Sequence, residues 1–125
     1  MKAALPLSVI LVLTGCGSGA ETSAPAPTGP PVSELRIGLL EYRLALSADA
    51  LQPGTVTATI TNAGSTGHDV RFRQGGKVLG ASEVLSPGGT QTLSLELAPG
   101  VPVELDCTVG GHAEAGMRTT LAVVD

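Results

Sequence analysis

The chain has 125 residues and a formal net charge of −4, with 11 acidic and 7 basic side chains. It has no Trp, one Phe and one Tyr, so any hydrophobic core must be built almost entirely from aliphatic side chains. The mild negative charge argues against a nucleic-acid partner, because phosphate binding needs a basic surface.

The first 16 residues have the pattern of an export signal. Lys2 gives a positive start, and the run Ala3–Leu13 is apolar but too short to remain as a membrane-spanning helix. The run ends in the letters LTGC, which resemble a bacterial lipobox, so we expect Cys16 to be lipidated and to anchor the protein to a membrane. An ordinary secretory signal peptide is the alternative. Both interpretations place the protein in the cell envelope, in the periplasm or on the outer face of the cytoplasmic membrane.

Residues 17–32 are rich in Gly, Ser, Thr, Ala and Pro and contain one charged side chain, Glu21. A segment of this composition cannot bury enough apolar surface to order itself, so we expect a linker. The remaining residues, 33–125, are expected to form one small domain.

Alternating apolar and polar residues dominate this domain. Val56, Ala58 and Ile60 alternate with Thr residues, and the same two-residue period recurs in Leu93–Leu97 and near Val103. Turn signals rich in Gly and Pro separate these short segments. The pattern predicts an all-β sandwich or barrel.

Four side chains indicate a metal site: His68, Cys107, His112 and Met117. Two imidazoles, one thiolate and a weak thioether form the ligand set of a blue copper centre. Each residue alone has a common structural explanation, but these four include both His residues and the only Met and Cys outside the export signal. Metal binding would also explain an unpaired Cys in an exported domain. We therefore expect one type 1 copper ion as cofactor.

From Glu41 to the C-terminus, the chain resembles small cupredoxins of the plastocyanin and azurin type. The resemblance lies in the segment 54–64 leading to His68, in Pro99-Gly100, and in the spacing Cys-x4-His-x4-Met that ends at Met117. It implies a Greek-key β-sandwich of about seven or eight strands. It also implies a blue copper protein that shuttles single electrons between redox partner proteins of the cell envelope, acting as a monomer.

The chain departs from the usual cupredoxin pattern near the expected ligands. Val103 and Leu105 stand where Tyr and Phe are common, so aromatic support of the site is expected to be missing. Asp69 replaces a frequent Asn and is expected to accept a hydrogen bond from the Thr108 hydroxyl. Its negative charge would favour the oxidised, more positive metal.

An enzyme is not expected, because copper oxidases and nitrite reductases need His clusters beyond the blue site. Both His residues of this chain are already assigned to that site. Two other interpretations remain: a copper storage or delivery protein with a cupredoxin fold, and a metal-free sandwich that acts as an adhesion module.

Overall fold

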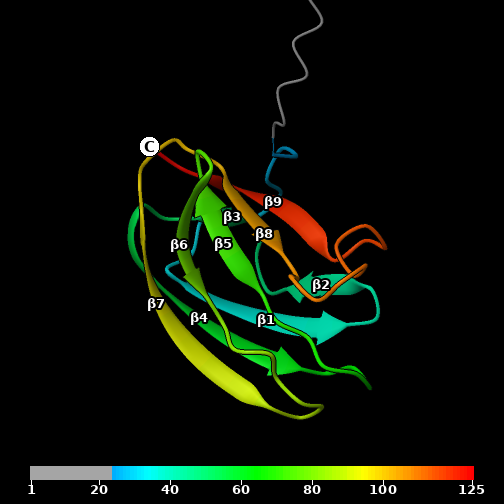
Figure 1. The fold of residues 1–125 in the computed structure, drawn as a ribbon. Helices are drawn as coiled ribbons and strands as arrows, with labels where there is room; N and C mark the ends of the chain where they lie inside the picture. Colours follow the sequence, from blue (N-terminus) through cyan, green and yellow to red (C-terminus); the bar gives the residue numbers. More distant parts are fainter. Residues whose placement is uncertain (1–23) are drawn as a thin grey trace, which may run out of the picture.

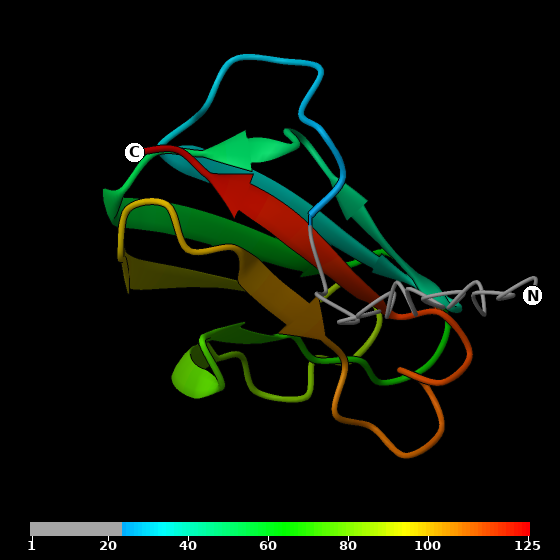
Figure 2. The same ribbon diagram turned by 90° about the horizontal axis from the view of Figure 1, so that it is seen from above.

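The computed structural model describes residues 24–125, which fold into two β-sheets packed face to face (Figures 1 and 2). The first sheet has the order β2-β1-β4-β7, and the second has the order β3-β9-β8-β5-β6. Within the described residues there are nine strands: β1 (Glu34–Leu40), β2 (Arg43–Leu46), β3 (Ala50–Leu51), β4 (Gly54–Asn62), β5 (Arg71–Gln74), β6 (Lys77–Ala81), β7 (Thr90–Leu97), β8 (Val103–Asp106) and β9 (Arg118–Val123). The prediction of an all-β Greek-key sandwich is confirmed, and the short β3 brings the total above the expected number.

The alternation in the sequence places the core between the two sheets. On β4, the side chains of Val56, Ala58 and Ile60 are fully buried, whereas Thr55 and Thr57 are exposed. Burial of β-branched residues on one face of a strand is favourable both for the strand conformation and for the hydrophobic effect. Phe72 on β5 is the largest fully buried side chain and is surrounded by aliphatic residues.

The sheet topology gathers several loops at one end of the sandwich. Strands β1 and β4 pair in parallel, with Ile37 opposite Ile60. Because parallel strands finish at the same end of a sheet, the turn after β1 and the loop after β4 lie at one end of the sandwich. In the second sheet, β8 pairs antiparallel with β5 and β9, and the loop between β8 and β9 lies at this same end (Figures 1 and 2). Chain segments far apart in sequence are thereby brought together.

The last residues of the predicted linker contact the domain. The backbone N–H and hydroxyl of Thr28 donate hydrogen bonds to Asp49 Oδ2, at 2.6 and 2.7 Å, and Gly29 donates to Asp49 Oδ1. Val32 also bridges to Leu51.

The expected export signal and Cys16 lie outside the described residues, so the lipid anchor and the division of the chain at residues 16 and 32 stay predictions. In the part of the chain that is described, no helix is long and apolar enough to cross a membrane.

The amide of Asn62 at the end of β4 organises the following loop. Its buried side chain donates hydrogen bonds to the carbonyls of Thr66 and Leu85, at 2.8 and 2.7 Å, and accepts one from the N–H of Gly64. We expect Asn62→Ala to lower the free energy of unfolding by about 1–3 kcal/mol, because these buried groups lose a partner. Urea unfolding of the metal-free protein measures the change.

A suitable control is Gln52→Ala, which removes an exposed amide from the turn before β4. This change is expected to alter the free energy of unfolding by less than about 0.5 kcal/mol. Equal urea midpoints for the two variants would contradict the role assigned to Asn62.

Candidate metal centre

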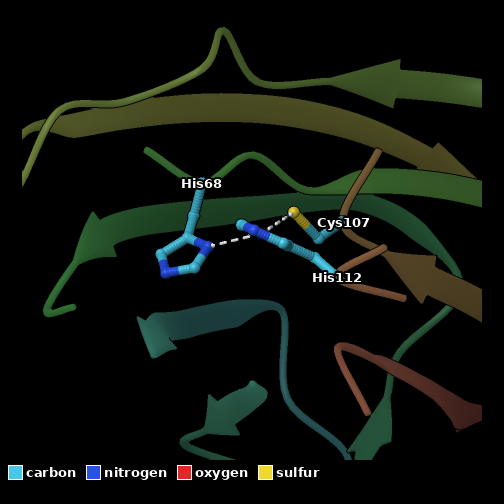
Figure 3. A group of neighbouring side chains, drawn as sticks. All are labelled: His68, Cys107 and His112. Atoms are coloured by element: carbon cyan, nitrogen blue, oxygen red, sulfur yellow. Dashed lines mark hydrogen bonds between the residues drawn. The ribbon is translucent and has the colours of Figure 1, made fainter. Parts of the chain in front are cut away.

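Three candidate ligands meet at this end of the sandwich (Figure 3). His68 comes from the loop after β4, Cys107 directly follows β8, and His112 lies in the loop between β8 and β9. The Nδ1 atoms of the two His rings are 3.1 Å apart, and Cys107 Sγ lies 3.6 Å from His112 Nδ1. One donor atom from each residue lies within 4.8 Å of the other two.

These separations fit a metal site. A metal with bonds of about 2.0–2.3 Å to N and S donors in one plane would hold those donors roughly 3.5–3.7 Å apart. The distances from His112 Nδ1 to the other two donors are close to this, so an ion would require only small side-chain movements. The nature of the donors, two imidazoles and a thiol, fits copper in the trigonal His₂Cys class of site.

Met117, the predicted axial ligand, belongs to the same cluster of residues. Its side chain is fully buried. Its backbone N–H donates to the carbonyl of His112 at 3.1 Å, and its own carbonyl accepts from the N–H of Cys107 at 2.9 Å. The loop thus closes on itself, with Cys107 and Met117 at its two ends.

The loop between these two residues is tightly wound. His112 N–H donates to Val109 O, and Gly116 N–H donates to Ala113 O, each at 3.1 Å. Gly116 has a φ of 127°, and a Cβ at this position would lie 2.8 Å from the carbonyl oxygen of Tyr42. A residue with a side chain would be strained there and would push the loop away from the β1–β2 turn.

His68 is held on both its backbone and its ring. Its N–H and C=O pair with Leu85, at 3.2 and 2.7 Å, and its side chain is fully buried. Its Nε2 atom lies 2.9 Å from Glu41 Oε1. The hydrogen bond from His68, followed by that from the Ser65 N–H, lowers the pKa of Glu41 to about 2, so this carboxyl is ionised at neutral pH.

His112 differs from His68 because it is only half-buried. The Tyr42 ring packs edge-on against it, with 5.1 Å between ring centroids and an angle of 64°. Val103 and Leu105 are buried aliphatic residues. The site nevertheless has an aromatic neighbour, contributed by the β1–β2 turn, which the sequence interpretation did not anticipate.

Asp69 joins the segment of His68 to the loop of the other ligands. This buried carboxylate accepts a hydrogen bond from the Thr108 N–H at 2.6 Å, and a second from the Thr108 hydroxyl. The expected hydroxyl contact is therefore present, and the backbone contact strengthens it. Charge-assisted hydrogen bonds of this kind are stronger than those between neutral groups.

Burial raises the pKa of the Cys107 thiol, because the charged thiolate is poorly solvated in the core. The metal-free side chain is therefore protonated at neutral pH. Thiolate is the form that binds metals, so metal binding at Cys107 must release a proton.

Sequence reasoning did not find Glu41 or Tyr42. Both lie in a short turn, and a charged or aromatic residue in such a turn is usually solvated, so no local pattern distinguishes them. Their roles follow from the parallel pairing of β1 and β4, which brings the turn beside the loop of His68.

No protein-family model matches the chain, and no curated protein matches it. Solved structures do share its fold. Auracyanin from the photosynthetic bacterium Roseiflexus castenholzii matches with a TM-score of 0.65 and 21% identity, over 77% of this chain and 100% of that one. Auracyanin A, a "blue" copper protein from Chloroflexus aurantiacus, matches with a TM-score of 0.57 and 17% identity, over 75% of this chain and 99% of that one.

The same fold occurs within enzymes. Copper nitrite reductase from Nitrosomonas europaea matches with a TM-score of 0.54 and 17% identity, over 73% of this chain but only 41% of that one. At these identities the likeness is one of fold. The chain has the cupredoxin fold, and its His, Cys and Met residues fit the ligand set of a type 1 copper site.

Proposed function

We propose that the protein binds one copper ion as a type 1 site and carries single electrons between redox partner proteins. The ligands are His68, Cys107, His112 and Met117. The observation that carries this proposal is the convergence of two imidazoles and a buried thiol within 4.8 Å at one end of a cupredoxin fold. The names of the similar solved structures, which include a "blue" copper protein, support it.

The arrangement suits electron transfer for a physical reason. Bound copper supplies a one-electron couple, and the protein supplies a fixed, dry environment. His68, Cys107 and Met117 are fully or almost fully buried, and hydrogen bonds hold their backbones in place. The ligands therefore need to move little when the charge of the metal changes.

The half-buried ring of His112 provides the route to the surface. Small residues flank it in the sequence, including Gly110, Gly111, Ala113 and Ala115, which favours close approach of a partner without a groove. Contacts between electron-transfer proteins are typically small, below about 1,200 Å² of buried surface, which allows rapid release.

An electron carrier is favoured over an enzyme by the number of His residues. The chain has only two, and both lie in the proposed site. None remains for a second metal centre of the kind that a copper nitrite reductase uses.

A copper storage or delivery protein is the second candidate, but the burial of Cys107 and Met117 argues against rapid metal exchange.

Addition of Cu(II) to the purified full-length protein tests the proposal. We expect one copper per chain and an intense visible absorption, which arises from charge transfer between the thiolate and the metal. The Cys107→Ser variant should lose this absorption, and the control Cys16→Ser should retain it. A colourless wild-type protein would overturn the proposal, and a colourless protein that binds and readily exchanges Cu(I) would favour copper delivery.

The axial ligand is expected to set the reduction potential. Gln in place of Met117 offers a harder oxygen donor, which stabilises Cu(II) and should lower the potential. Leu in its place offers no donor and should raise it. Voltammetry of Met117→Gln and Met117→Leu measures both shifts, and equal potentials would remove Met117 from the ligand set.

We further propose that a lipid on Cys16 tethers the protein to a membrane outside the cytoplasm. The support is the position of the letters LTGC directly after a short apolar run. Cys16→Ser should move the protein from the membrane fraction to the soluble fraction of the cells. A wild-type protein found in the soluble fraction would instead indicate an ordinary signal peptide.

A further inference from the structure

The carboxylate of Glu41 is the most heavily hydrogen-bonded acidic group near the proposed site. Its Oε1 atom accepts from the N–H of Ser65 at 2.7 Å, and from the N–H and hydroxyl of Thr66 at 3.0 and 3.1 Å. The fourth donor is His68, whose Nε2 lies 2.9 Å away. A single oxygen of the β1–β2 turn therefore fixes both the backbone before His68 and the ring of His68.

The loop is shaped to admit this carboxylate. A Cβ on Gly64 would lie 2.5 Å from Glu41 Oε1 and 2.8 Å from Oε2, which is closer than real Cβ contacts allow. Only a glycine at position 64 lets the carboxylate approach without displacement. The contact therefore depends on both Glu41 and Gly64. Glu41 is not simply a solvated acid that happens to lie beside this loop.

The contact determines which nitrogen of His68 carries the proton. An ionised carboxylate only accepts hydrogen bonds, so the Nε2–H of His68 must be the donor. The lone pair then lies on Nδ1, which faces His112 Nδ1 at 3.1 Å. With His68 in this tautomer, its Nδ1 can only accept across the gap, so a hydrogen bond there would need His112 Nδ1–H as the donor.

We propose that Glu41 is a positioning residue of the copper site, which holds the His68 ring with its Nδ1 lone pair directed toward the metal and favours Cu(II) through its negative charge. The proposal rests on the proposed copper site. Carboxylates bound to the second nitrogen of a metal-binding His orient the ring and increase its basicity. Glu41 contacts the ring of a candidate ligand, His68, directly. Asp69 instead accepts hydrogen bonds from the backbone and hydroxyl of Thr108, which is not a ligand.

Three variants separate orientation from charge. Glu41→Gln keeps an oxygen that accepts the same hydrogen bonds but removes the charge, and Glu41→Ala removes both. Asp69→Asn is the matched control, because it removes one charge near the site without changing any contact of the His68 ring.

The first measurement uses the full-length protein without metal, at neutral pH. Nitrogen-15 NMR of the imidazole reports which ring nitrogen is protonated. We expect His68 to be the Nε2–H form in the wild type, in Glu41→Gln and in Asp69→Asn, and to be a mixture of both forms in Glu41→Ala. This result does not depend on copper, so it tests Glu41 even if the proposed function fails.

The second measurement uses the copper-loaded protein. Glu41→Ala is expected to reduce copper affinity about 10–100-fold, and Glu41→Gln should remain close to the wild type. Both Glu41→Gln and Asp69→Asn should have a higher reduction potential than the wild type, because each loses a charge that stabilises Cu(II). Of these three variants, only Glu41→Ala should combine a weakened affinity with an altered ring tautomer.

Gly64→Ala provides an independent test should Glu41→Ala fail to fold. The added methyl group should displace the carboxylate and reproduce the mixed tautomers and the weaker copper binding, although Glu41 itself is still present. The proposal is overturned if His68 keeps its Nε2–H form and wild-type copper affinity in Glu41→Ala or Gly64→Ala. An unchanged potential in Glu41→Gln would overturn the part assigned to charge.

Discussion

The whole candidate site depends on a buried carboxylate that joins two loops of different origin. His68 follows a strand of one sheet, and Cys107 follows a strand of the other, so neither loop alone determines the distance between their side chains. Asp69 removes that freedom by accepting both hydrogen bonds that Thr108 can donate. Because Asp69 and Thr108 each directly follow a candidate ligand, the restraint acts within one residue of both donor atoms. The donors are thereby placed together before any metal arrives, which lowers the conformational cost of binding.

The two carboxylates that hold the loops would also attract the proposed metal. Glu41 and Asp69 place two carboxylates beside the imidazole rings and the protonated thiol of the candidate ligands. A positive ion bound by the ligands would be attracted by both, and the attraction would be stronger for buried Asp69 than for exposed Glu41. In the proposed copper site, these charges would favour the more highly charged of the two oxidation states. The same carboxylates are satisfied by backbone N–H groups in the metal-free chain, so the fold does not require the ion in order to hold them.

Several features of this molecule were predictable because they are encoded locally. The alternation at Val56, Ala58 and Ile60 indicates a strand with one buried face, and the structure confirms the all-β class. The spacing of the Cys, His and Met residues indicates that one loop presents them together. The contacts of Glu41 and Tyr42 were not predictable, because they depend on the parallel pairing of β1 with β4. Periodicity in a single sequence predicts which segments form strands. It does not predict which strands pair with each other in a sheet.

The aliphatic core also restricts how charge can travel through the protein. Many redox proteins relay electrons over oxidisable rings, but this chain has no Trp, and Phe72 is enclosed by aliphatic side chains. Its single Tyr lies against His112, at the end of the sandwich where the donors meet. In the proposed electron carrier, the end with His112 and Tyr42 would be the route to the surface, and a partner would have to dock there for an electron to cross.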